Sequence, residues 1–228
     1  MASEASLTTV PMKRIARSLT LCILLSCSLW AQSGPFLFVF LNTNPGKPDL
    51  SKEQVDSIMA GHLANITRLA NEGKIIAAGP FQGGGGIFVF ATDSKDSAWS
   101  WLGTDPGIRA KRWIIETMPY VPRIGSICSV GEDYEMTSYT FVRYMLAQTS
   151  TKKSVLDGSD SHLEYINATL PKDSVVAEGI LSDGMGSILV LRGEWAESAF
   201  LKEPLVQKKV LDVLVRKIWI ARGSFCER

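Results

Sequence analysis

Apolar and polar positions follow two kinds of pattern along the chain. Short apolar runs rich in β-branched and aromatic residues alternate with longer segments whose apolar residues recur every three or four positions. In the first half these patterns predict, in order, a strand, a helix, two strands, a helix and a strand, at residues 36–43, 51–73, 75–81, 86–92, 94–111 and 113–118. This order is that of the ferredoxin-like, or split βαβ, unit.

The same order of elements returns in the second half. The predicted elements are strand 139–147, helix 160–170, strands 174–181 and 187–193, helix 195–210 and strand 212–221. His62-Leu63 matches His162-Leu163 at an offset of 100, and Gly84 and Gly86 match Gly184 and Gly186 at the same offset. A repeat at a nearly constant offset indicates duplication. We therefore predict an α+β fold of two tandem βαββαβ units, at 34–123 and 139–228, joined by a linker at 124–138.

Four glycines at positions 83–86 separate two of the predicted strands. A phosphate-binding loop would need a helix after the glycines, with a Lys and a Ser or Thr at its start. The chain instead continues as IFVF, which is a strand pattern. The glycines therefore predict a β-hairpin turn.

The first 33 residues have the pattern of a secretory signal. Basic residues at positions 13, 14 and 17 precede an apolar run at 19–30, which is shorter than the ~20 residues that span a membrane. We expect export to the periplasm or medium, with no membrane span after the signal is removed. A lipobox-like stretch ending at Cys27 leaves a lipid anchor there as the alternative.

Export changes what the cysteines mean. Outside the signal the chain keeps Cys128 and Cys226, which follow the last strand of each unit in GSIC and GSFC. In an oxidising compartment two equivalent thiols can pair, so we predict a disulfide between them.

The charge balance is close to neutral, with 24 Lys and Arg against 23 Asp and Glu in 228 residues. Such a balance gives no electrostatic signature of nucleic-acid binding. No close group of His, Cys and carboxylates has metal-ligand spacing, so we expect neither a metal nor a cofactor. A haem-ligand role for His62 is the alternative.

The chain contains two histidines, and they occupy equivalent places in the two units. His62 lies on the apolar stripe of its predicted helix and should face the sheet. Asp105 and Glu203 also occupy equivalent places, each before a proline. A carboxylate that holds one imidazole nitrogen makes the other an acid–base group near neutral pH. The alternative is a pair of core histidines bonded internally, with Asp105 as a turn residue.

Several segments resemble the YCII-related domain of the dimeric α/β-barrel superfamily. They are GHLANITRLANEGKIIAAGPF, GGGGIFVF and TDPGIRAKR, within residues 36–120, whereas the second half fits more weakly. The resemblance implies two ferredoxin-like units packed sheet to sheet as an intramolecular dimeric α/β barrel. It also implies a catalytic pair at His62 and Asp105, with His162 and Glu203 as the weaker counterpart. The substrate-binding residues would be Gly79, Pro80 and Phe81; the second half has Gly-Ile-Leu there.

These features together predict an exported YCII-like protein that binds a small organic molecule. The enzyme reading is His/Asp-assisted proton transfer of the lyase or isomerase type. The alternative is a non-catalytic ligand-binding or scaffolding module with the same fold. A pseudo-dimer forms within one chain in either case, and further homo-oligomers stay open. Arg123 and Arg143, near the junction of the units, are expected on the solvated surface, with the binding of an anionic substrate group as the alternative.

Overall fold

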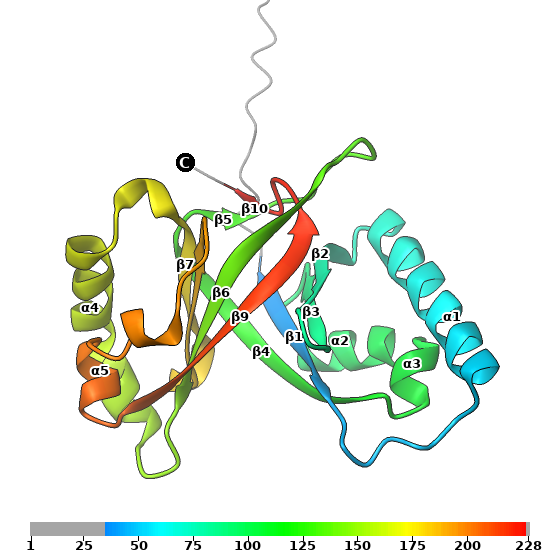
Figure 1. Cartoon of the computed structure of the whole chain (residues 1–228), viewed down its shortest axis with the longest axis horizontal. Coiled ribbons are helices and arrows are strands. Elements are labelled where there is room, and N and C mark those ends of the chain that lie inside the picture. The colour runs from blue at the N-terminus through cyan, green and yellow to red at the C-terminus, as the bar shows by residue number, and fades with distance from the viewer. Residues whose placement is uncertain (1–34, 227–228) are drawn as a thin grey trace, which may run out of the picture.

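A computed structural model describes residues 35–226. These residues form an α+β structure with one large antiparallel sheet and several helices (Figure 1). The helices gather at opposite ends of the molecule, α1 to α3 at one end and α4 and α5 at the other, with the sheet between them. The predicted signal at 1–33, including Cys27, lies outside the described residues, so export and lipid anchoring stay predictions. In the described part of the chain, no helix is long and apolar enough to cross a membrane.

The elements of the two halves follow the same order. The first half comprises β1 (Phe36–Thr43), α1 (Lys52–Asn71), β2 (Ile75–Pro80), β3 (Gly86–Phe90), α2 (Lys95–Leu102), α3 (Pro106–Arg109) and β4 (Trp113–Ile124). The second comprises β6 (Met136–Leu146), α4 (Lys152–Thr169), β7 (Val175–Leu181), β8 (Gly186–Leu191), α5 (Pro204–Gln207) and β9 (Leu211–Ala221). Short 3₁₀ turns lie at Lys172–Ser174, Ser182–Gly184 and Glu197–Ala199.

The eight long strands form one continuous sheet in the order β2-β3-β1-β4-β7-β8-β6-β9. Each half contributes four neighbouring strands in the same relative order, and the halves join where β4 pairs with β7. The two edge strands also meet. Phe81 forms a bridge with Ile218, and the backbone N–H of Gln82 donates to the carbonyl of Lys217 at 2.8 Å. The sheet therefore curves until β2 lies against β9, which brings side chains of the second half to the first.

The inner face of this curved sheet holds the main core. Because side chains alternate along a strand, every second residue of the long strands points inward. Phe38 packs edge-on against Tyr120 at 4.8 Å between ring centroids, and Phe141 packs in the same way against Phe81 at 5.2 Å. Burial raises the pKa of Tyr120 above its usual value. Two further apolar clusters fill the spaces between the outer face and the helices at each end.

Prolines break two of the predicted helices. The segment 94–111 forms α2 and α3 as separate helices, and the segment 195–210 forms only a 3₁₀ turn and α5. The breaks fall at Asp105 and Glu203, which precede Pro106 and Pro204 and have extended backbones with ψ of 120° and 132°. A residue before proline is sterically pushed out of the helical region. Both carboxylates consequently become N-caps of the short helices that follow.

Other element boundaries also differ from the prediction. Helix α4 begins at Lys152 rather than near residue 160, because the side chain of Thr151 caps its first turn. Strands β4 and β6 extend into the segment predicted as a linker. That segment also contains β5 (Ser126–Ile127), which pairs with β10 (Phe225–Cys226).

The glycine-rich turn is a hairpin connection between β2 and β3, with no helix after it. Gly83, Gly84 and Gly85 all have positive φ, between 73° and 106°. A Cβ on Gly85 would lie 2.2 Å from the carbonyl oxygen of Leu41. The turn therefore needs glycine both for its backbone angles and for its close approach to β1.

Cys128 and Cys226 form a disulfide, with their Cα atoms 5.5 Å apart. The bond joins the end of the first half to the end of the chain across a separation of 98 residues. A disulfide restricts the unfolded chain, so we expect Cys226→Ser to lower the free energy of unfolding by about 2–4 kcal/mol. Urea unfolding of both proteins, with and without reductant, measures this. Reductant should shift the wild-type midpoint and leave the variant unchanged; an unshifted wild type would contradict the prediction.

Candidate functional site

The side chains of His62 and Asp105 meet between α1 and α3. His62 Nδ1 lies 2.8 Å from Asp105 Oδ2, and both residues are buried, with 7% and 1% of their surface exposed. His62 comes from the sheet-facing side of α1, whose start is fixed by a capping box at Ser51. Asp105 comes from the break before Pro106.

The carboxylate of Asp105 is held at both oxygens. Its Oδ1 accepts hydrogen bonds from the backbone N–H groups of Gly107 at 2.8 Å and Ile108 at 3.1 Å, which leaves Oδ2 for His62. A carboxylate only accepts, so the proton of a neutral His62 ring sits on Nδ1. Nε2 then carries the free lone pair, which is the arrangement of a general base.

A polar network also contacts this pair. Asn65 Nδ2 lies 3.4 Å from Asp105 Oδ2, and Asn65 Oδ1 accepts from Arg68 at 2.8 Å and from Thr104 at 3.0 Å. Asn65 is itself buried, one helical turn from His62. At the positions offset by 100, the second half has Tyr165 and Ala168 in place of Asn65 and Arg68. Among the described residues, this network is therefore found in the first half only.

A cavity of about 470 Å³ lies beside the His62 ring. Nε2 makes no hydrogen bond to any described residue, while the ring packs against Phe88 and Trp113 with centroids 5.8 and 4.7 Å away. Apart from His62, the side chains that line the cavity are uncharged and apolar, including Met59, Leu63, Met136 and Trp219. The cavity thus offers one titratable nitrogen in an apolar surrounding.

The wall opposite α1 is supplied by the second half. Met136 of β6 and Trp219 of β9 reach this cavity because β9 closes against β2. Neither residue was predicted from the sequence. No local pattern could have identified them, since their contribution depends on how the sheet closes.

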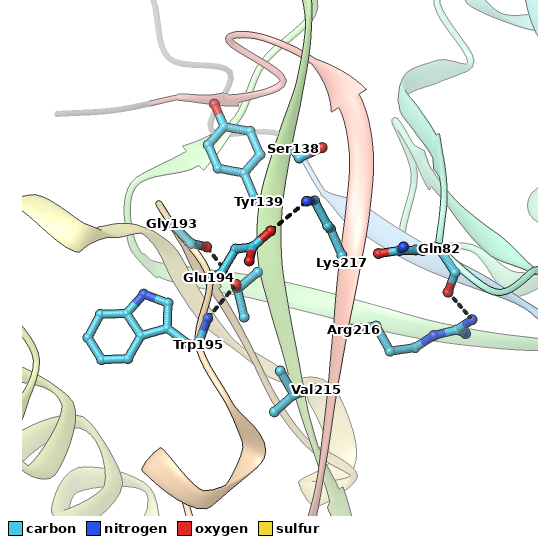
Figure 2. Close-up of a pocket in the computed structure, with 10 residues that line it drawn as sticks. Gln82, Ser138, Tyr139, Gly193, Glu194, Trp195, Val215, Arg216 and Lys217 are labelled. Carbon is cyan, nitrogen blue, oxygen red and sulfur yellow. Dashed lines mark hydrogen bonds and ion pairs between the residues drawn. The ribbon is translucent and has the colours of Figure 1, made fainter.

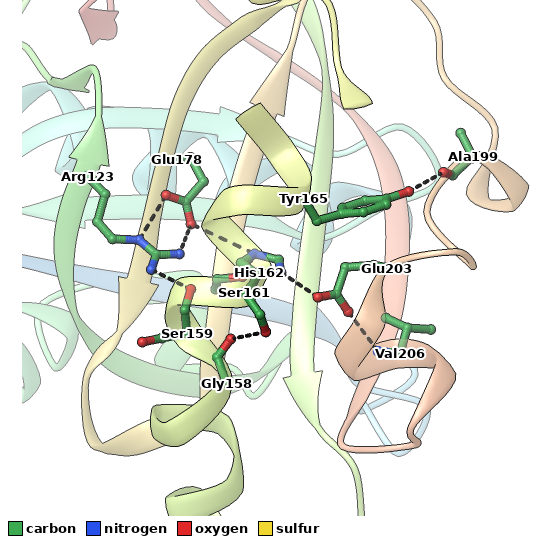
Figure 3. A network of polar contacts seen from close by, with 11 residues as sticks. Arg123, Gly158, Ser159, Ser161, His162, Tyr165, Glu178, Ala199, Glu203 and Val206 are labelled. Atoms are coloured by element: carbon green, nitrogen blue, oxygen red, sulfur yellow. Dashed lines mark hydrogen bonds and ion pairs between the residues drawn. The ribbon is translucent and has the colours of Figure 1, made fainter. Parts of the chain in front are cut away.

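The second histidine has no free nitrogen (Figure 3). His162 Nδ1 lies 3.1 Å from Glu203 Oε1, and Nε2 lies 2.9 Å from Ser187 Oγ and 3.8 Å from Glu178 Oε1. Glu203 also caps α5, because Oε2 accepts from the N–H of Val206 at 2.7 Å. The ring of Tyr144 packs edge-on against the His162 ring at 4.7 Å. Burial raises the pKa of Tyr144, so its hydroxyl stays neutral.

Strand pairing identifies the residues that fill the second site. In β1–β3, Leu41 pairs with Gly86, and in β6–β8, Tyr144 pairs with Ser187. In β2–β3, Ala78 pairs with Phe88, and in β7–β8, Glu178 pairs with Leu189. Leu41, Ala78 and Gly86 line the first cavity. Their counterparts Tyr144, Glu178 and Ser187 surround His162 instead, so three substitutions separate an open site from a filled one.

The pairing also corrects the sequence comparison of the glycines. Gly86 was matched to Gly186, but the counterpart of Gly186 is Gly85. A Cβ on Gly85 would collide with the carbonyl of Leu41, and one on Gly186 would collide with that of Tyr144. The turn of the second half is one residue longer, which moves the offset in this strand from 100 to 101.

The remaining predicted residues lie in different surroundings. Gly79 and Pro80 line the cavity beside His62, whereas Phe81 does not line it and belongs to the inner core.

Arg123 and Arg143 are not on the solvated surface. Arg123 forms a two-point ion pair with the buried Glu178 at 2.6 and 3.0 Å. Arg143, 6% exposed, lies over the Phe40 ring and bonds Glu116 at 2.6 Å.

Among residues 35–226, no group of three or more His, Cys, Asp and Glu side chains is arranged to hold a metal ion.

No family model matches the chain. No curated protein matches it either. Two solved structures, each titled a "putative monooxygenase", resemble it. The one from Lactobacillus acidophilus is 11% identical, covers 82% of this chain and 93% of its own, and has a TM-score of 0.39. The one from Fusobacterium nucleatum is 8% identical, covers 86% and 98%, and has a TM-score of 0.46.

Proposed function

We propose that this protein binds a small organic molecule, places an uncharged part of it in the cavity beside His62, and moves a proton on that part. His62 Nε2 would take a proton from a carbon or hydroxyl of the ligand and return it to another atom of the same molecule, as an isomerase does, or to the group that leaves as a double bond forms, as a lyase does. Asp105 would orient the ring and stabilise the imidazolium that forms. The reaction type is that of an isomerase or lyase.

One observation carries this proposal. Each histidine has a carboxylate partner at Nδ1, but the surroundings of Nε2 are opposite in the two halves. At His162 that nitrogen is bonded, whereas at His62 it faces a cavity. A histidine kept only for packing would be expected to have both nitrogens satisfied, as His162 does. The apolar lining favours an uncharged group inside this cavity, because burying an unpaired charge there would be costly.

The wider assignment is also part of the proposal. We infer that the two halves are tandem ferredoxin-like units of the YCII-related type, forming within one chain the barrel that separate subunits form elsewhere. The matching strand orders of the halves and the contact between β2 and β9 support this. We further propose that the protein is exported, which suits the Cys128–Cys226 disulfide.

The test uses 2-tetralone, an uncharged ketone with exchangeable α-hydrogens, in deuterated buffer. We expect the protein to accelerate the exchange of these hydrogens for deuterium, followed by ¹H NMR. Diethyl pyrocarbonate should modify His62 and stop the exchange. Mass spectrometry should locate the modification at this one of the two histidines. His162 should stay unmodified, because both its nitrogens are occupied.

Two outcomes would overturn the enzyme reading. Exchange that continues after complete modification of His62 would exclude that ring as the base. Saturable binding of 2-tetralone without exchange would favour the non-catalytic ligand-binding module.

A further inference from the structure

The cavity beside His62 continues along the outer face of the sheet. A second hollow of about 270 Å³ shares Pro80 and Trp219 with it. A third, of about 480 Å³, shares Gln82, Ser138 and Lys217 with the second. Three hollows that share lining residues in this order adjoin one another, and we call them together the seam groove because they follow the contact between β2 and β9.

Strand pairing explains why the groove is continuous. Ser138 pairs with Trp219, and Thr140 pairs with Lys217, so these four side chains stand on the same face of β6 and β9. Lys217 lies two residues from Trp219, which is about 7 Å along a strand. The hairpin turn between β2 and β3 forms the other side of the groove, since the N–H of Gln82 is bonded to the carbonyl of Lys217.

The two ends of the groove differ in chemistry. The end at His62 is apolar, while the far end has two cationic side chains, Arg216 and Lys217, and one anionic side chain, Glu194 (Figure 2). Arg216 is already committed to the hairpin, because its guanidinium donates to the carbonyls of Gln82 and Gly84 and lies over the Phe81 ring. Among the described residues, the ammonium group of Lys217 is bound only to Glu194, at 2.7 Å, and the side chain of Glu194 is 83% exposed.

An exposed ion pair of this kind contributes little and exchanges readily for another anion. The side chain of Lys217 is 44% exposed, so a ligand within the groove can reach it. Ser138 adds a hydroxyl beside it, and Gln82 adds a side-chain amide.

We propose that the natural ligand is an elongated amphiphile, whose apolar end occupies the cavity beside His62 and whose anionic group binds Lys217. This deepens the proposed function by naming its substrate class, and it rests on that function for the role of His62. The apolar part would lie against Trp219, which lines both the cavity beside His62 and the second hollow. The anion would take the place of Glu194 at Lys217.

Two dyes that differ in one group test the proposal. 8-Anilinonaphthalene-1-sulfonate carries an anionic sulfonate, and N-phenyl-1-naphthylamine is the same molecule without it. Fluorescence titration should show that Lys217→Ala weakens the binding of the sulfonate dye about threefold to fivefold, the range of an exposed ion pair, and that of the neutral dye less than twofold. Glu194→Gln should tighten the binding of the sulfonate dye, whereas Trp219→Ala should weaken the binding of both dyes.

The matched control is Lys153→Ala, which removes a lysine from an exposed ion pair with Asp157 on α4, outside the groove. It should leave both dyes unchanged. The proposal is overturned if Lys217→Ala affects both dyes equally or neither. If Lys217 discriminates the dyes but no His62-dependent exchange is found, the groove stands and the proposed chemistry fails. If His62-dependent exchange is found but Lys217 does not discriminate the dyes, the proposed chemistry stands and the amphiphile proposal fails.

Discussion

Replacing Asp105 with Asn is expected to slow the exchange of 2-tetralone by about 10²- to 10⁴-fold, as much as losing the base itself. The reason is the number of oxygens. Both carboxylate oxygens are in use, one by the N–H groups of Gly107 and Ile108 and the other by His62 Nδ1. Asparagine has one oxygen, and the two N–H groups at the start of α3 would claim it.

The amide NH₂ would then face His62 Nδ1. Because an amide NH₂ only donates, Nδ1 would have to accept, and the proton of the neutral ring would move to Nε2. A protonated Nε2 cannot abstract a proton. Stability should change by less than about 1 kcal/mol, since Asn is as good an N-cap as Asp.

Glu203→Gln is the matched control for this prediction. It makes the same chemical change in the second half, where Glu203 also contacts a histidine and caps a helix. Exchange measured per folded protein should stay within about twofold of the wild type, because both nitrogens of His162 are already hydrogen-bonded. If Asp105→Asn also stays within a few-fold of the wild type, Asp105 is a helix cap and nothing more.

The pairing of His62 with Asp105 could be predicted from sequence because its causes are local or repeated. A histidine on an apolar stripe must face the sheet, and a carboxylate before a proline must leave the helix. The repeat then placed both in equivalent positions twice. The order of strands and helices along the chain followed from the same patterns, since short strands and amphipathic helices have different periods.

The difference between the two sites could not be predicted in this way. It depends on Glu178 and Ser187 facing His162, and the position of Ser187 depends on a turn one residue longer in the second half. A shift of one residue moves a strand side chain to the other face, so an offset of 100 in place of 101 hides the correspondence. Trp219 reaches the first site through sheet closure, which no local pattern encodes.

Removing the positive charge at Arg123 is expected to have the largest effect on stability among the side chains considered. Arg123 on β4 and Glu178 on β7 join the two halves at the centre of the sheet. The carboxylate of Glu178 is fully buried, and Arg123 also donates to the carbonyl of Ser159 in α4 at 3.0 Å. Arg123→Met would leave Glu178 without its cation, at a cost of about 3–5 kcal/mol in the free energy of unfolding.

Urea unfolding of three further variants separates this cost from the loss of packing. Lys153→Met breaks an ion pair whose side chains are 80% and 62% exposed, and it should cost at most about 0.5 kcal/mol. Glu178→Leu combined with Arg123→Met should recover most of the loss, because no unpaired charge stays buried. Glu178→Leu alone should be costly, since the guanidinium then lacks its carboxylate. A loss below about 1 kcal/mol for Arg123→Met would mean that water reaches Glu178, and the cluster around His162 would then be open to solvent rather than sealed.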